Sequence, residues 1–160
     1  MKIGCKKGNQ MSKEQFLKDL ETGEYTENKI VDFIKIKYPK TYKYEGKFKD
    51  YDIKIPEKDI TIEVKTDIGS AESSNYFIEF SCNEVDSGIN STKADYWIIC
   101  DETDIIWIKT SMLKSVCTIE GVYWKGKPKG CNSIVESYLV DKYIMRENSE
   151  KIIRKEKYGL

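Results

Sequence analysis

The chain of 160 residues contains no histidine, and it has no apolar run long enough to cross a membrane. Without histidine there can be no Ser-His or Cys-His hydrolase, and no zinc site built on imidazole ligands. Without a long apolar run, the sequence predicts no membrane-spanning helix and no membrane partner. Basic and acidic residues number 27 each, and this zero net charge argues against tight nonspecific binding to nucleic acid.

Cysteine is sparse and scattered. The five cysteines never fall in the paired spacing of a metal site or of a disulfide framework. We therefore expect reduced, mostly buried thiols and a cytoplasmic protein. No signal peptide is predicted, because the lysines near the first residue are not followed by an apolar region. The length and composition predict a single domain over residues 1–160.

What the sequence does contain is a predicted β-hairpin that carries acids and a lysine. Apolar and polar residues alternate in residues 51–55 and again in residues 60–65, which is the period of half-buried strands. The alternation predicts that Asp52, Glu63 and Lys65 lie on the same polar face of this hairpin.

Two carboxylates beside a lysine are a donor set suited to cutting phosphodiesters. A hard cation such as Mg²⁺, or Mn²⁺ in its place, binds carboxylate and carbonyl oxygens and stabilises charge on a phosphate. We expect Asp52 and Glu63 to be its ligands. The carbonyl of Val64 would be a third ligand, and Lys65 would assist the attacking water. The same pattern also fits a solvated strand face with a cross-strand ion pair, and the hairpin alone leaves both interpretations open.

Asp52 followed by Glu63-Val64-Lys65 resembles the Asp…(Asp/Glu)-x-Lys motif of the PD-(D/E)XK nuclease superfamily, which has the restriction-endonuclease-like fold. The residue before the aspartate is Tyr51 and not proline, a departure that many members share. The resemblance implies an α/β domain with a mixed central β-sheet flanked by helices, in the order α-β-β-β-α-β. It also implies a Mg²⁺-dependent nuclease of the small stand-alone phage or bacterial type, such as the Holliday-junction resolvases.

Two helices are expected upstream of the hairpin. The first begins after Ser12 and is broken by Gly23, and the second is capped by Thr26 and ends before Pro39. Glu27 would then lie in the first turn of the second helix, near the positive end of its dipole. In the resembling family the first core helix often carries a glutamate that aids metal binding, and Glu27 matches it. The alternative is an acid that merely favours a helix N-terminus.

Three further strands and a helix are expected downstream. Residues 75–80 are predicted to be a third strand, in which Glu79 lies either on the face of the metal site or on an exposed edge. Residues 96–100 form a near-continuous apolar run, typical of a core strand covered on both faces, and residues 105–108 are expected to pair with it. A short helix is predicted over residues 110–116.

The segment before the core strand resembles the part of these nucleases in which a small helix-turn with a lysine precedes a buried strand. Ser87, Thr92 and Lys93 would place hydroxyls and a cation at the mouth of the site, where they suit phosphate oxygens. As structure alone, Lys93 would be a surface cation.

The resemblance covers residues 24–116 and leaves residues 117–160 as a C-terminal extension. Residues 121–130 are basic, and they fit either a nucleic-acid contact or a hairpin whose rings cover the core. Residues 133–143 are expected to return as a strand or a helix. Residues 146–157 are charged, helix-prone and expected to fray.

The sequence therefore predicts a metal-dependent endonuclease acting on DNA. A single site cuts one strand, so cutting a duplex or a four-way junction would need a homodimer. One alternative is a catalytically silent nucleic-acid-binding or assembly module of the same fold. Another is a small interaction protein whose charged hairpin is merely exposed, which predicts no stabilisation by metal.

Overall fold

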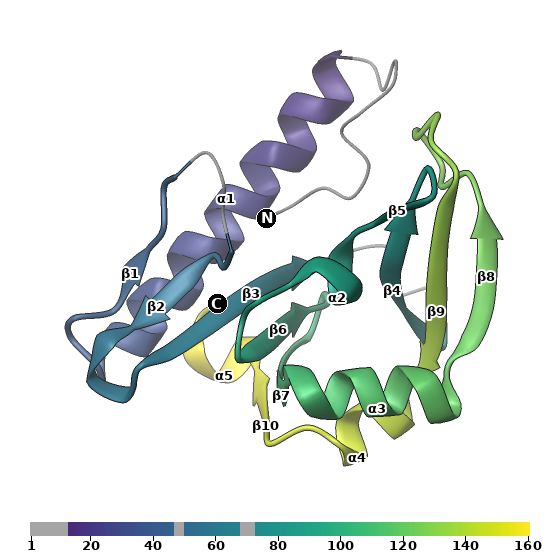
Figure 1. Cartoon of the computed structure of the whole chain (residues 1–160). Coiled ribbons are helices and arrows are strands. Elements are labelled where there is room, and N and C mark those ends of the chain that lie inside the picture. The colour runs from purple at the N-terminus through teal and green to yellow at the C-terminus, as the bar shows by residue number, and fades with distance from the viewer. Residues whose placement is uncertain (1–12, 47–49, 68–72) are drawn as a thin grey trace.

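The structure is a computed structural model that describes residues 13–46, 50–67 and 73–160, with only the backbone described for 13–20. Two β-sheets and their flanking helices make up the fold (Figure 1). One sheet has six strands in the order β1-β2-β3-β6-β7-β10, and the other has four in the order β5-β4-β9-β8. The expected α/β class, with a mixed central sheet flanked by helices, is confirmed.

The six-stranded sheet contains β1 (Tyr42–Lys43), β2 (Ile53–Ile55), β3 (Ile60–Thr66), β6 (Tyr96–Cys100), β7 (Asp104–Lys109) and β10 (Lys151–Arg154). The four-stranded sheet contains β4 (Asn75–Cys82), β5 (Val85–Asp86), β8 (Val122–Gly126) and β9 (Val135–Asp141). The helices are α1 (Lys13–Lys35), α2 (Gly88–Ser91), α3 (Thr110–Glu120), α4 (Lys142–Glu147) and α5 (Lys155–Tyr158), and a 3₁₀ turn, η1 (Pro56–Lys58), lies between β2 and β3. β3 runs parallel to β6, and the other neighbouring strands are antiparallel.

The predicted hairpin forms as β2 and β3, with Ile53 opposite Ile62. Its apolar side chains are buried because α1 packs on them through residues spaced one helical turn apart. One core cluster joins Ile30, Val31 and Ile34 of α1 to the hairpin isoleucines and to Val64. α1 thus covers one face of the six-stranded sheet.

The second core cluster fills the space between the two sheets. It contains Tyr76 and Ile78 of β4 together with Trp97 and Ile99 of β6. The intervening residue Ile98 belongs instead to the cluster under α1. The prediction that residues 96–100 form a core strand covered on both faces, paired with the strand that follows, is therefore confirmed.

The upstream prediction of two helices is wrong, because α1 is continuous from Lys13 to Lys35. A glycine inside a helix costs only about 1 kcal/mol, and packing of the apolar face of α1 offsets it at Gly23. Thr26 does not cap a helix, since its hydroxyl donates to the carbonyl of Thr22 one turn earlier, at 2.9 Å. Glu27 consequently lies in the middle of a helix and not at its N-terminus. Ser12 lies outside the described residues.

The strand predicted over residues 75–80 forms, but it does not belong to the sheet that contains the hairpin. Residues 75–80 form most of β4, which belongs to the four-stranded sheet. The sheet containing the hairpin gains β1 instead, which pairs with β2 ahead of the hairpin. The alternation of residues 75–80 predicts a strand but not the sheet to which it belongs. Tyr76 and Ile78 are buried between the two sheets, so the apolar face of β4 is covered although it does not join the hairpin.

The C-terminal region is part of the fold and not a frayed extension. β8 and β9 form a hairpin, but Tyr123 is exposed and does not cover the core, and the nucleic-acid contact stays a prediction. Residues 133–143 continue as β9 and the start of α4. Residues 151–154, expected to be helical, form the edge strand β10 because Ile153 is buried in the cluster under α1.

Candidate functional site

Asp52 is fully buried at the start of β2 and binds the backbone of β3. Its N–H donates to the carbonyl of Ile62, and its Oδ2 accepts from the N–H of Val64, both at 2.8 Å. Ile62 and Val64 are the two chain neighbours of Glu63. Asp52 therefore lies against the part of β3 that carries Glu63, as the sequence predicts.

The way in which Asp52 reaches this position differs from the prediction. Ile62 is the register partner of Ile53, yet it also accepts a hydrogen bond from Asp52, so two residues of one strand oppose a single residue of the other. Such bulges interrupt the strict alternation of side chains. The bond between the Asp52 carboxylate and the Val64 N–H, and not alternation, fixes where this side chain lies.

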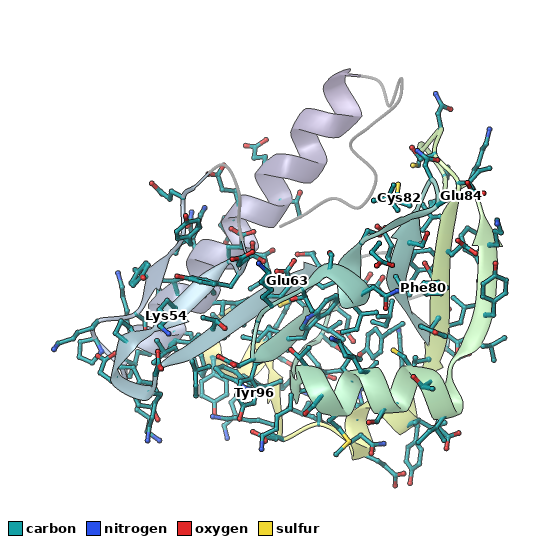
Figure 2. All side chains as sticks on the ribbon, in the orientation of Figure 1. Lys54, Glu63, Phe80, Cys82, Glu84 and Tyr96 are labelled. Carbon is teal, nitrogen blue, oxygen red and sulfur yellow. The ribbon has the colours of Figure 1, made fainter. Side chains whose placement is uncertain are left out.

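Glu63 and Lys65 follow the predicted alternation on β3. They are register partners of Trp97 and Ile99 on β6, so both lie on the sheet face turned away from α1. Glu63, labelled in Figure 2, is only 6% exposed, and Lys65 is half-buried. The interpretation of this hairpin as a solvated polar face is therefore wrong for Asp52 and Glu63.

Asp67 continues the polar row of β3 and was missed by the motif, although the alternation of Glu63 and Lys65 extends to it. Its N–H donates to the carbonyl of Cys100 at 2.8 Å, and its Oδ2 accepts from the N–H of Phe77 in β4 at 3.4 Å. Burial raises the pKa of Asp67 above its ordinary value, while the positive charge of Lys65 acts in the opposite direction. Lys65 and Asp67 are therefore electrostatic neighbours.

Glu27 is buried between α1 and β1, where it faces a lysine that the motif does not include. Lys43 Nζ lies 3.6 Å from Glu27 Oε2 and 3.4 Å from Glu24 Oε1. The Lys43 side chain is only 12% exposed, so this is a largely buried ion pair. The only sequence signal for it is a lysine between two tyrosines just ahead of the hairpin.

The described residues contain no group of three acidic or cysteine side chains placed to hold a metal ion together. Glu27 is therefore not assembled with Asp52 and Glu63 into a three-carboxylate site. The backbone N–H of Val64 donates a hydrogen bond to Asp52, and the Val64 side chain packs under α1. Asp52 and Glu63 still offer only oxygen donors, and Mg²⁺ in proteins is commonly held by one or two carboxylates with water and substrate phosphate as the other ligands.

The three predicted phosphate-binding residues have different surroundings. The Ser87 hydroxyl donates to Glu79 Oε1 at 2.6 Å, and the Thr92 hydroxyl is buried and accepts from the N–H of Ala94 at 3.3 Å. Lys93 is exposed, and its Nζ lies 3.3 Å from a carboxylate oxygen of Asp50. Of the three, only Lys93 is a solvent-facing cation, and its partner is two residues from Asp52.

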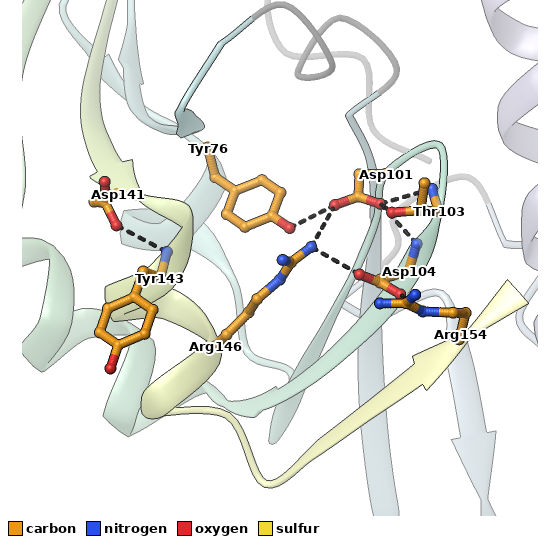
Figure 3. A network of polar contacts seen from close by, with 8 residues as sticks. All are labelled: Tyr76, Asp101, Thr103, Asp104, Asp141, Tyr143, Arg146 and Arg154. Atoms are coloured by element: carbon orange, nitrogen blue, oxygen red, sulfur yellow. Dashed lines mark hydrogen bonds and ion pairs between the residues drawn. The ribbon is translucent and has the colours of Figure 1, made fainter.

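A second group of buried acids lies at the turn between β6 and β7 (Figure 3). Tyr76 donates to Asp101 Oδ2 at 2.6 Å, and Arg146 Nη2 lies 3.6 Å from the same oxygen. Arg146 Nη2 also lies 2.7 Å from Asp104 Oδ2, and Arg154 Nε lies 3.4 Å from the other oxygen of Asp104. This network joins β4, the β6–β7 turn, α4 and β10.

The backbone of the same turn completes the environment of Asp101. Its Oδ1 accepts from the N–H groups of Thr103, at 2.9 Å, and Asp104, at 2.7 Å. Burial by itself would raise the pKa of Asp101, but the hydrogen bonds from Tyr76 and from these N–H groups outweigh burial and hold the pKa below its ordinary value. The sequence shows this turn as a run of acids and gives no sign of the arginines that meet it.

The cysteines follow the prediction only in part. Cys100 and Cys117 are buried free thiols, and burial raises the pKa of each to about 12. Cys131 is free and half-buried, but Cys82 is disulfide-bonded. The expectation of reduced thiols is therefore wrong at Cys82, and the cysteine pattern gives no support to a cytoplasmic location. No helix within the described ranges is long and apolar enough to span a membrane.

Comparison with known proteins gives no relative. No family model matches the chain, and neither the search of curated proteins nor that of solved structures returns a match.

Proposed function

We propose that the protein is a metal-dependent endonuclease that hydrolyses phosphodiester bonds in DNA. In this proposal Asp52 and Glu63 hold Mg²⁺, and Lys65 assists the attacking water. The observation that carries it is the burial of both carboxylates in one hairpin, where Asp52 bonds to the residue between Glu63 and Lys65. A hairpin whose charges served only solubility would expose them.

The burial has an energetic consequence. Removing a carboxylate from water costs free energy unless a positive charge or hydrogen-bond donors compensate it. Mg²⁺ bound by Asp52 and Glu63 would stabilise charge on the phosphate and favour formation of hydroxide from a bound water. The Val64 N–H orients Asp52, and the ammonium of Lys65 is one alternation step beyond Glu63 on the same sheet face. From there it can donate to the phosphate or to the water.

The strands that carry the motif support the same proposal. The meander β1-β2-β3 follows α1, and β4 and β5 of the other sheet come between it and α2 and β6. Asp52 immediately precedes the second strand of the meander, and Glu63 lies in the third. The resembling superfamily likewise carries its motif on the second and third strands of a meander. Lys93, beside Asp50, would contribute a phosphate contact at the edge of the site.

The test is cleavage of single-stranded, duplex, flap and four-way-junction DNA, with RNA for comparison, in Mg²⁺ or Mn²⁺. Lys65→Ala is expected to lower the rate by about a thousandfold, or about 4 kcal/mol of transition-state stabilisation. The matched control is Lys54→Ala, because Lys54 lies in the same hairpin but pairs with Asp59. Equal activity of wild type and Lys65→Ala would contradict the assignment of Lys65.

The alternative is a catalytically silent nucleic-acid-binding or assembly module of the same fold. The described residues hold no three-acid group, and the two buried carboxylates are present in both candidates. This candidate predicts DNA binding without cleavage in every metal. The absence of any rise in melting temperature with Mg²⁺ or Mn²⁺ would instead favour the small interaction protein. Metal-dependent cleavage would exclude the silent module.

A further inference from the structure

β8 is a sheet edge with no strand beyond it in the described chain (Figure 1). It spans five residues, Val122–Gly126, and pairs through one side only, with β9. Its first two side chains are exposed although they are apolar or aromatic: Val122 is 65% exposed and Tyr123 is 56% exposed. Ile119, at the end of the preceding helix, is 76% exposed. An edge of this kind presents unpaired backbone groups and apolar surface together.

We propose that β8 pairs with β8 of a second copy of this chain, antiparallel and about a two-fold axis at Trp124. Centring the axis on the middle residue uses the whole strand. Val122 then faces Gly126 of the second copy, and Tyr123 faces Lys125. No like charges meet in this register, and each tyrosine ring lies opposite a lysine, a favourable cross-strand combination. The two four-stranded sheets would become one continuous sheet.

The other edges of the two sheets are poorer candidates for the same pairing. β1 and β5 contain two residues each, too few for a stable ladder. β10 contains four, Lys151–Arg154, and full antiparallel pairing with its copy would set Lys151 against Arg154 on both sides of the axis. Like charges directly opposite are destabilising. Length and charge together therefore select β8.

A lysine on an edge strand commonly protects against such pairing, but Lys125 is already engaged within its own sheet. Its Nζ lies 3.6 Å from Glu136 Oε1, and the Tyr123 hydroxyl donates to the same oxygen at 2.6 Å. Both side chains are thus held against β9. Their polar ends have partners, and the ring and the aliphatic stem remain to contact the second copy.

The inference rests on β8 and is independent of the proposed nuclease. If both hold, the dimer carries two sites, which is what cutting both strands of a duplex requires.

The test is sedimentation velocity of the full chain over a wide range of concentration. Wild type is expected to show a monomer–dimer equilibrium. Tyr123→Lys sets lysine against lysine twice at the axis, and we expect its dissociation constant to rise about tenfold or more. Tyr25→Lys is the matched control, because Tyr25 is a 62% exposed tyrosine on α1, and it should dimerise like wild type. Circular dichroism establishes that each variant is folded.

A double variant makes the register itself testable. Tyr123→Lys with Lys125→Glu sets a lysine against a glutamate in the same register and should recover most of the lost affinity. A wild type that stays monomeric at the highest soluble concentration would overturn the inference, and so would a Tyr123→Lys variant that dimerises like wild type. Failure of the double variant to recover affinity would overturn the Trp124-centred register.

Discussion

Two groups of buried acids lie along the six-stranded sheet, one at the β6–β7 turn and one at the β2–β3 hairpin. The contacts recorded for the two groups differ. At the β6–β7 turn, Asp101 and Asp104 meet Arg146, and Asp104 also meets Arg154. Immediately before β2, the Asp52 carboxylate accepts a hydrogen bond from the backbone N–H of Val64, and Lys65 of β3 is half-buried. One group is an arginine-paired network, and the other is a pair of carboxylates on adjacent strands.

The difference bears on function because the two groups are equally buried. Burial alone perturbs carboxylates wherever it occurs, so it does not identify a site. A network in which arginines and hydrogen-bond donors surround each acid is sufficiently explained by folding, since it joins four elements (Figure 3). We assign the proposed metal site to the hairpin acids, where the Val64 N–H orients Asp52. Variants in the two groups should therefore separate stability from activity.

The largest expected effect is the loss of activity in Asp52→Asn. The amide oxygen can still accept from the Val64 N–H, so the free energy of unfolding should change by less than about 1 kcal/mol. Removing the charge of a metal ligand should lower the rate of metal-dependent cleavage by about a thousandfold, or about 4 kcal/mol. Cleavage assays and urea unfolding on the same preparation measure both quantities.

If Asp52→Asn instead unfolded the protein while leaving the residual activity per folded molecule unchanged, the hairpin acids would be structural like Asp101. The comparison between the two groups would then fail.

The next effect is a loss of stability without loss of activity in Arg146→Met. The substitution keeps much of the apolar stem but leaves Asp101 and Asp104 without their shared cation. Breaking a buried pair costs about 3–5 kcal/mol, and since the Arg146 side chain is 35% exposed we expect about 2–3 kcal/mol. Arg154→Met is the control: its side chain is 71% exposed, and the loss should stay below about 1 kcal/mol. Urea unfolding measures both, and equal losses would show that the network does not depend on burial.

The same contrast explains what could be predicted from the sequence. The β2–β3 hairpin was predictable because its apolar residues alternate with polar ones, and the core strand β6 was predictable because it is a short, near-continuous apolar run. The sequence predicted that Asp52 lies beside β3. It did not predict the bulge in which Asp52 and Ile53 both oppose Ile62, because no residue pattern indicates that bulge.

The rest required tertiary contacts that have no local signal. Gly23 does not end α1, because packing against the sheet outweighs its low helix propensity. β10 is a strand because Ile153 fills the core under α1, although its neighbours are charged and helix-prone. Arg146 and Asp104 are 42 residues apart in the sequence, and no pattern of residue spacing predicts their contact.

The smallest expected effect concerns pH, and it sets Asp67 against Asp101. Burial raises the pKa of Asp67, so its charged form costs stability above the folded pKa, and this cost disappears as the pH falls below the unfolded value. Asp67→Asn keeps an acceptor for Phe77 and should raise the free energy of unfolding at neutral pH by less than about 1 kcal/mol.

The pKa of Asp101 is lowered, so its contribution has the opposite sign: it is present above the unfolded value and is lost as the pH falls through the folded one. Asp101→Asn should therefore be less stable than wild type at neutral pH, where Asp67→Asn is more stable. Both differences should shrink in acid, because protonation makes each wild-type aspartate as neutral as its replacement. Urea unfolding of the three proteins at neutral pH and in acid tests this. A destabilised Asp67→Asn at neutral pH would mean that the charge of Lys65 outweighs burial there, and that Lys65 is committed to Asp67 and not to the site.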